Sequence, residues 1–278
     1  MTNPVSIANV QPATDVVRVV QLTDVHLCQQ RGGTLLGMNT DESLQTVIRK
    51  VLRERDQIDL VLGTGDLSDR GALEAYERLE TYFEALPAPH FWLPGNHDDR
   101  GQMLAAARSD DRLIGEIRAG NWQILMLDSQ IPREVGGRLG AAELARLEQA
   151  LGRAESAGLH SLLCLHHQPV SIGSAWIDQQ MVEDAAAFWA LIERFNCVRG
   201  VLWGHVHQEI EQERGPVRLM ASPSTCVQFA PESVEFQADG MPPGYRWLDL
   251  HSDGRIDSAV SRIEEELYVD LESDGYLD

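Results

Sequence analysis

The stretch WLPGNHDDR, residues 92–100, changes abruptly from an apolar run to Asn96, His97, Asp98 and Asp99. The run before it is short, aromatic and apolar, which predicts a buried strand, and Pro-Gly predicts the turn that ends this strand. A loop that only had to be soluble would not need an amide, an imidazole and two carboxylates side by side. Because functional side chains concentrate on loops held by a rigid scaffold, this stretch indicates a ligand-binding strand end.

The same arrangement recurs at four other places in the chain. Hydrophobic runs end in polar residues in VVQLTDVH (19–26), LVLGTGDLSD (60–69), LLCLHHQP (162–169) and GVLWGHVH (200–207). The carboxyl ends of the strands in an open α/β sheet lie along one edge, and ligands bind there. We therefore expect seven side chains that can bind metal to meet at this edge: Asp24, His26, Asp66, Asn96, His166, His205 and His207.

The spacing within two motifs supports this prediction. Asp24 and His26 are two residues apart, as are His205 and His207, and on an extended strand end such residues point to the same side. Any single motif also has an ordinary interpretation as a turn or a capping residue. The occurrence of all five motifs together, each at a strand end, favours a shared metal site. Imidazole, carboxylate and amide ligands suit ions such as Fe, Mn or Zn.

Short apolar runs alternate with amphipathic helical segments along the chain. Strands are predicted over 17–22, 60–64, 90–94, 122–128, 161–166, 198–204 and 218–222. Their continuous hydrophobicity is typical of strands that are covered on both faces. One helix is predicted to begin with Thr40 as its N-cap, because an apolar stripe follows at helical spacing. Further helices are predicted at about 72–86, 140–155 and 181–195. This alternation indicates a layered α/β core.

The end of the chain differs from the rest. Strands come closer together after residue 215, and GYRWLDLHSDGRI predicts a hairpin with its turn near 252–254. We expect residues 1–262 to form a single domain. The strongly acidic segment 263–278 is predicted to be a solvated C-terminal tail.

Composition excludes several classes of partner. The chain of 278 residues carries 43 acidic and 23 basic side chains, a net charge of −20, which argues against binding to nucleic acid or to anionic lipid. No apolar run approaches the roughly 20 residues of a membrane helix, and the N-terminus does not resemble a signal peptide. Four scattered cysteines without a Cys-x-x-Cys pair indicate reduced thiols. We therefore expect a soluble cytoplasmic protein.

The series Asp-x-His, Gly-Asp, Gly-Asn-His-Asp, His and Gly-His-x-His, from Asp24 to His207, resembles the calcineurin-like metallophosphoesterase superfamily. The resemblance implies a four-layer αββα sandwich, with two central mixed sheets flanked by helices. It also implies two divalent metal ions per chain, with Fe or Mn ahead of Zn. The implied ligands of one ion are Asp24, His26 and His207; those of the other are Asn96, His166 and His205, with Asp66 bridging both. His166 is preferred to His167, although the segment HHQP leaves that choice open.

The resemblance also implies roles in catalysis. A hydroxide activated by the two metals would be the nucleophile, so that no serine or cysteine nucleophile is needed. His97 would contact the phosphate or protonate the leaving oxygen, and Asp98 would orient it. The residues expected to contact substrate are His26, Asp66, Asn96, His97 and His207.

Finer features extend the resemblance over most of the chain. GNHDD (95–99), LGMNTDESLQTVI (36–48) and SPSTCVQFAPES with PGYRWLDLHSDG (222–254) are similar to bacterial class III cyclic-nucleotide phosphodiesterases. This similarity implies hydrolysis of 3′,5′-cyclic AMP to 5′-AMP, which would lower intracellular cAMP. The expected partner is thus a small cyclic nucleotide, and a homodimer stays open.

Other functions stay open at this point. The substrate could be a 2′,3′-cyclic nucleotide, a glycerophosphodiester or a phosphoprotein. GDLSDRG (65–71) also resembles a motif of protein Ser/Thr phosphatases, but those continue with Gly-Asn-His-Glu where this chain has Asp98. A non-catalytic scaffold for protein binding is the remaining alternative, since a fold alone does not imply a function.

Overall fold

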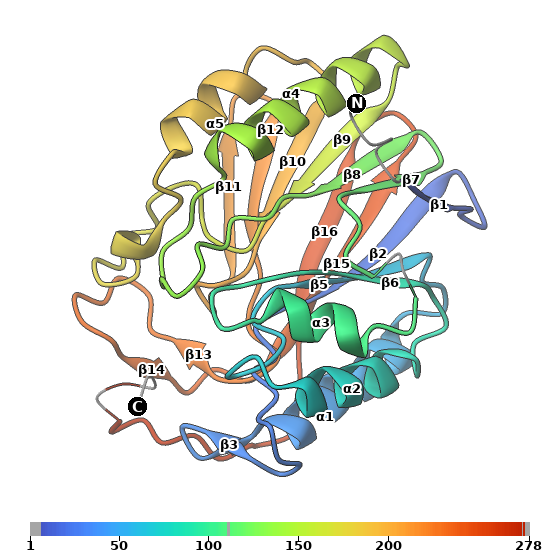
Figure 1. The fold of residues 1–278 in the computed structure, drawn as a ribbon. Coiled ribbons are helices and arrows are strands. Elements are labelled where there is room, and N and C mark those ends of the chain that lie inside the picture. Colours follow the sequence, from blue (N-terminus) through green and yellow to red (C-terminus); the bar gives the residue numbers. More distant parts are fainter. Residues whose placement is uncertain (1–6, 110–111, 274, 276–278) are drawn as a thin grey trace.

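The computed structural model describes residues 7–109, 112–273 and 275, in which two mixed β-sheets pack face to face between helices (Figure 1). The larger sheet has seven strands, in the spatial order β1 (Ala8–Val10), β7 (Glu116–Ala119), β8 (Trp122–Met126), β9 (His160–Cys164), β10 (Val198–Trp203), β12 (Val217–Ala221) and β11 (Ile210–Arg214). Its central strands β8, β9, β10 and β12 run parallel, and β11 closes one edge antiparallel to β12.

The smaller sheet has five strands, in the order β16 (Ile256–Arg262), β15 (Gly244–His251), β2 (Val16–Leu22), β5 (Leu60–Thr64) and β6 (His90–Leu93). Here β2, β5 and β6 are parallel, with Leu22 opposite Gly63 and Thr64 opposite Leu93. This register places the carboxyl ends of the three strands level with one another. β15 pairs antiparallel with β2.

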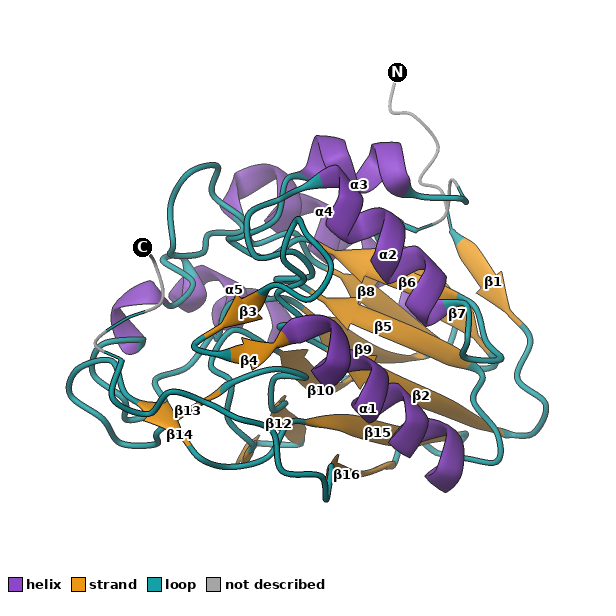
Figure 2. Cartoon of the chain, turned by 90° about the horizontal axis from the view of Figure 1, so that it is seen from below, coloured by secondary structure: helices purple, strands orange, loops and turns teal. Residues whose placement is uncertain are grey.

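The helices form the two outer layers. α4 (Gly140–Ser156) and α5 (Ala185–Ile192) cover the seven-stranded sheet, whereas α1 (Thr40–Glu54), α2 (Leu73–Phe83) and α3 (Arg100–Ala106) cover the five-stranded sheet (Figures 1 and 2). Short pairs of strands lie in the loops at the ends of the sheets: β3 (Thr34–Leu35) with β4 (Met38–Asn39), and β13 (Gln228–Phe229) with β14 (Ala238–Asp239). One turn of 3₁₀-helix, η1 (Asp178–Gln180), precedes α5.

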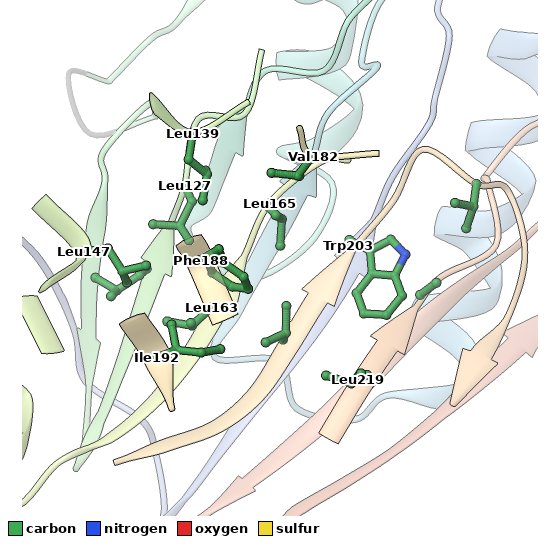
Figure 3. Close-up of a cluster of buried hydrophobic side chains, with 14 of the residues drawn as sticks. Leu127, Leu139, Leu147, Leu163, Leu165, Val182, Phe188, Ile192, Trp203 and Leu219 are labelled. Carbon is green, nitrogen blue, oxygen red and sulfur yellow. The ribbon is translucent and has the colours of Figure 1, made fainter. Parts of the chain in front are cut away.

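Three apolar clusters hold these four layers together. In the first cluster, Leu147 of α4 and Phe188 of α5 face Leu163 of β9 (Figure 3). A second cluster fills the space between the two sheets, and a third lies between the five-stranded sheet and its helices. The predicted four-layer αββα sandwich is therefore confirmed.

Successive residues of one strand enter different clusters. Val19 of β2 faces the other sheet, and Val20 faces α1 and α2. In β9, Leu162 faces the other sheet and Leu163 faces α4 and α5. Neighbouring side chains on a strand point to opposite faces, so a strand covered on both faces must be apolar at every position. This explains the continuous hydrophobic runs of the sequence.

Most predicted elements are confirmed, and their boundaries differ in a few places. All seven predicted strands are present, and β15 and β16 form the predicted hairpin. The N-cap of α1 is Asn39 rather than Thr40, because the Asn39 side chain accepts a hydrogen bond from the Glu42 N–H at 3.1 Å. α5 begins at Ala185, later than predicted. β1, β7, β11 and α3 were not predicted.

The segment after β16 continues along the body of the protein. Ile263 is buried, and Leu267 and Val269 pack against the apolar clusters. The Asp270 N–H donates a hydrogen bond to the Leu36 carbonyl at 2.8 Å. The apolar side chains of this segment therefore pack on the protein while the acidic side chains at 264–266 are exposed, and the solvated tail over 263–278 stays a prediction. A domain boundary at 262 stays a prediction, and residues 274 and 276–278 lie outside the described residues.

Within the described part of the chain, no helix has the length and apolar character needed to cross a bilayer.

Candidate metal centre

The polar residues that follow β2, β5, β6, β9 and β10 converge at one edge of the sandwich, as predicted. The loops after β2 and β5 are joined directly: the Asp24 N–H donates to the Gly65 carbonyl at 3.0 Å, and the His26 N–H donates to the Asp66 carbonyl at 2.9 Å. Four overlapping groups of ligand atoms, each within 4.8 Å of one another, lie at this edge. The edge is therefore a buried cluster of carboxylates and imidazoles.

The backbone reaches this arrangement by a different route from the one predicted. Asp24, His26, Asp66, His205 and His207 all have positive φ, between 48° and 65°, so the two-residue motifs are not extended. They are five of the eight non-glycine residues with positive φ among the described residues. Such conformations cost about 1–3 kcal/mol each and concentrate at functional sites. The sharp turns bring the side chains together in place of the expected same-side alternation.

One group of ligand atoms joins Asp24, His26 and His207. The His207 Nε2 lies 3.4 Å from Asp24 Oδ1 and 3.3 Å from the His26 Nε2. All three side chains are buried. These are the three residues that the sequence predicts for the first metal ion.

The second group surrounds Asp66. Its Oδ2 lies 3.2 Å from the His166 Nε2 and 3.8 Å from the His26 Nε2, so this carboxylate faces ligands of both predicted ions. The same His166 Nε2 is 3.2 Å from Asn96 Oδ1. The position of Asp66 between the two groups is the one that a bridging ligand needs.

His205 completes the cluster. Its backbone N–H donates to the Asp24 carboxylate at 3.0 Å, and its ring centroid lies 5.1 Å from that of His166. The His205 Nε2 is buried and has no hydrogen-bond partner among the described residues. An unpaired buried polar atom is costly, and a metal ion would satisfy it. The residues present thus fit a pair of divalent cations.

Outer contacts direct the Nε2 atoms into the cluster. The Nδ1 of His166 lies 2.9 Å from the Thr64 carbonyl, and the Nδ1 of His207 lies 2.8 Å from the Val227 carbonyl. A carbonyl only accepts, so each Nδ1 carries the proton and donates it, and Nε2 is left as the ligand atom. The His207 ring also stacks on Phe229, with centroids 4.0 Å apart.

Charge within the cluster suits cation binding. Burial lowers the pKa of His26 and of His205 well below the usual range, and neighbouring imidazoles add to this effect. Burial alone would raise the pKa of the Asp66 carboxyl, but His166 and His97 hold it well below its usual range. Burial would likewise lower the pKa of His166, but Asp66 and Asp24 raise it to about 9. Neutral imidazoles and ionised carboxylates are the forms that bind metals, and a cation would displace the His166 proton.

Two glycines are required by close approach to the carboxylates. A Cβ at Gly95 would lie 2.2 Å from Asp66 Oδ1, and a Cβ at Gly204 would lie 2.6 Å from Asp24 Oδ2. Any larger residue would displace a carboxylate. This explains the glycine in the motifs PGNHD and WGHVH.

His97 lies beside the cluster, half-buried, with its ring edge against His26 at a centroid distance of 4.8 Å. Its backbone N–H donates to Asp66 Oδ1 at 2.9 Å, and its Nδ1 lies 2.7 Å from the Asp69 carbonyl. That carbonyl, rather than the Asp98 side chain, therefore fixes the orientation of the imidazole.

Asp98 has a different position from the one predicted. Its buried carboxylate accepts hydrogen bonds from the backbone N–H groups of Leu67, Ser68 and Gly95 and from the Tyr76 hydroxyl. The expectation that Asp98 orients His97 directly is wrong in this structure. Asp98 instead joins the loop after β5 to the loop after β6, because a carboxylate can accept several hydrogen bonds at once.

The alternatives His166 and His167 occupy different surroundings. His166 contacts Asp66 and Asn96, whereas the Nδ1 of His167 lies 2.8 Å from Ser129 Oγ. His167 nevertheless shares a group of potential ligand atoms with His166 and His205. The geometry favours His166 as the ligand nearest to Asp66.

Sequence reasoning missed Ser129 and Gln130, which contact two of the site's loops. The Gln130 side chain reaches the Gly95 and Asp98 carbonyls, and Ser129 contacts His167. Both residues directly follow the predicted strand 122–128, so the strand-end pattern that found the other five motifs also applies to WQILMLDSQ.

Residues 17–209 match the family model described as Calcineurin-like phosphoesterase. The chain is 46% identical over 268 residues to the 3′,5′-cyclic adenosine monophosphate phosphodiesterase CpdA of Pseudomonas aeruginosa, covering 95% of this chain and 97% of that protein. It is 39% identical over 263 residues to the protein of the same name from Vibrio vulnificus, covering 94% and 95%.

A solved structure shares the fold at low sequence identity. A dimetal phosphatase from Danio rerio superimposes with a TM-score of 0.63 at 14% identity, covering 89% of this chain and 99% of that one. At this identity the likeness concerns the arrangement of the layers alone.

Proposed function

Because the chain belongs to the calcineurin-like phosphoesterase family, we propose that its buried cluster holds two divalent metal ions and hydrolyses 3′,5′-cyclic AMP to 5′-AMP. The chain is a hydrolase of the cyclic-nucleotide phosphodiesterase class. The observation that carries the two-metal proposal is the position of Asp66, whose Oδ2 is 3.2 Å from the His166 Nε2 and 3.8 Å from the His26 Nε2. This position would allow one carboxylate to bind both ions.

The two ions would have separate ligand sets. Asp24, His26 and His207 would hold one, and Asn96, His166 and His205 the other, with Asp66 shared. When bound, the ions would polarise the phosphoryl oxygens and lower the pKa of a bound water molecule. The ligand types favour Fe or Mn, with Zn as a third candidate.

His97 would supply the proton for the leaving group. Its Nδ1 is held 2.7 Å from the Asp69 carbonyl, so the imidazole keeps one orientation beside His26. From there it would donate a proton to the departing 3′ oxygen. General acid catalysis of this kind contributes about 10²–10⁴-fold to a rate. Contact with the phosphate would involve the ligand-bearing residues His26, Asp66, Asn96 and His207 as well as His97.

Room for a nucleoside exists beside the cluster. A cavity of about 400 Å³ has His207 in its lining, together with the polar or charged residues Gln208, Glu209, Glu211, Gln228, Asp239 and Arg262 and the apolar residues Phe229, Pro231 and Met241. This volume lies within the range of small-molecule sites. A cavity of this size would accommodate a group larger than phosphate, with Gln228 and Arg262 as hydrogen-bond donors and Glu209, Glu211 and Asp239 as acceptors for the hydroxyl groups of a ribose.

A panel of substrates tests the proposal. Metal-stripped protein would be supplied with Mn²⁺ or Fe²⁺ and assayed on 3′,5′-cAMP, 2′,3′-cAMP, bis-p-nitrophenyl phosphate and a phosphopeptide. We expect 5′-AMP from 3′,5′-cAMP as the preferred reaction, and His97→Ala should keep its metal but lose at least about 100-fold in turnover. Cleavage of the generic diester without action on 3′,5′-cAMP would refute the substrate, and inactivity on all four would favour the scaffold alternative.

A further inference from the structure

We propose that Ser129 and Gln130, which follow β8, are positioning residues that hold Asn96 and His166 in register across the two sheets. The inference rests on the proposed metal centre. It concerns the second ion, whose ligands come from different sheets: Asn96 follows β6 of the five-stranded sheet, and His166 follows β9 of the seven-stranded sheet. Neither positioning residue belongs to the five sequence motifs.

Gln130 clamps the turn that carries Asn96. Its amide nitrogen donates hydrogen bonds to the Gly95 carbonyl at 2.7 Å and to the Asp98 carbonyl at 2.5 Å. A primary amide has two N–H donors, so both are used on the two ends of one short turn. Asn96 and His97 lie between these ends, so the clamp fixes the backbone from which both side chains project.

Ser129 fixes the segment that carries His166. Its buried Oγ lies 2.8 Å from the His167 Nδ1 and accepts a hydrogen bond from the His167 backbone N–H at 3.3 Å. The Ser129 carbonyl accepts a hydrogen bond from the Arg138 N–H at 2.9 Å, which closes the loop over this contact. The residue next to His166 is therefore held through both its backbone and its ring.

Because the two residues are neighbours in the chain, they connect the segment that carries Asn96 to the segment that carries His166. Ser129 and Gln130 are consecutive, and their side chains contact different segments, one leading to His166 and the other to Asn96. The two ligands meet where the His166 Nε2 lies 3.2 Å from Asn96 Oδ1. A displacement of either segment would change this separation, and with it the fit of the second ion. The first ion would be affected less, because Asp24, His26 and His207 lie outside these two segments and only the shared Asp66 contacts the turn that Gln130 holds.

Substitution of Gln130 by leucine removes both donors and keeps a side chain of similar length. Outer contacts that orient metal ligands typically change metal affinity or activity by about 10–100-fold. We expect Gln130→Leu to weaken the binding of the second Mn²⁺ by at least about 10-fold, and the binding of the first by a clearly smaller factor. Ser129→Ala should act in the same direction. A general loss of stability would weaken the binding of both ions by similar factors. The ratio of the two affinities therefore distinguishes a loss of ligand positioning from damage to the fold.

The matched control is Gln45→Leu. Gln45 is also half-buried and donates to a backbone carbonyl, that of Asp41 at 3.0 Å, but this hydrogen bond lies within α1 rather than at the loops after β6 and β9. We expect the control to bind both ions with the affinity of the wild type. Thermal melting of the metal-free proteins would compare the cost to the fold in the two variants.

Calorimetric titration with Mn²⁺ decides the inference. If wild type binds two ions and Gln130→Leu binds the second within twofold of the wild-type affinity, the inference is overturned while the proposed function stands. If wild type binds no metal, the proposed function itself fails. Should Gln130→Leu not fold, Gln130→Asn, whose amide is too short to reach both carbonyls, replaces it, with the same criterion.

Discussion

His90, at the start of β6, should make the stability of this protein depend on pH below neutrality. The side chain is 2% exposed, and burial, with a contribution from Arg112, lowers its pKa to about 3. Glu80 lies nearby, with its Oε2 3.6 Å from the His90 Nε2, but Arg112 binds the Glu80 carboxylate at 2.9 Å and compensates its charge. Substitution of His90 by leucine removes the titrating group.

The size of the effect follows from the two pKa values. A histidine in the unfolded chain has a pKa near 6.5, so below that pH the unfolded state binds a proton that folded His90 does not accept until about pH 3. Because the unfolded state binds more protons, stability falls as the pH falls. With a folded pKa of about 3, the loss at pH 5 is about 2 kcal/mol relative to pH 8.

Urea unfolding of wild type and His90→Leu at pH 8 and pH 5, with chelator present, measures this loss. Other groups titrate equally in both proteins, so the difference between the two pH responses isolates His90. We expect the free energy of unfolding to drop about 2 kcal/mol less in the variant. Equal drops in the two proteins would refute the reasoning, because His90 would then protonate without cost in the folded state.

Three further predictions concern the site and the layers. His166→Gln should reduce bound metal from two ions to one, whereas His167→Gln should retain both; elemental analysis showing the reverse would transfer the ligand role to His167. Gly95→Ala places a methyl group 2.2 Å from Asp66 Oδ1, so the metal-free protein should lose about 1–3 kcal/mol and bind metal poorly, and wild-type melting and metal content would contradict this. Arg246→Met should cost about 1–3 kcal/mol in urea unfolding, because it removes the buried guanidinium that donates hydrogen bonds to Ser222 Oγ and the Ala221 carbonyl; an unchanged free energy of unfolding would show that these hydrogen bonds are dispensable.

The residues that meet at the site could be predicted from the sequence more completely than the details of the fold. Each ligand follows an apolar run, and parallel strands place such positions at one edge, so the meeting of Asp24 with His207 could be predicted from strand ends alone. The positive φ values of these residues could not be predicted, because glycine is the residue that commonly indicates this backbone conformation in a sequence, and these residues are not glycines.

Other features depend on contacts between segments that lie far apart in the sequence, and no local sequence pattern predicts such contacts. β11, IEQER, is largely exposed and polar, and it is a strand only because β12 lies beside it. Asp98 looked like a partner for the adjacent His97, but its carboxylate faces the backbone at Leu67 and Ser68 in another loop. Leu267 docks the acidic segment onto the core, although the charges around it predicted solvation.

The central claim is that two metal ions, sharing Asp66, are needed to hydrolyse 3′,5′-cAMP. It is tested most directly by measuring the initial rate of 5′-AMP release as Mn²⁺ is returned in molar steps to metal-stripped protein. We expect background activity without metal, a rate that continues to rise until two equivalents are bound, and no such recovery in Asp66→Ala. Full activity after verified removal of metal, or a rate that reaches its maximum at one equivalent, would contradict it.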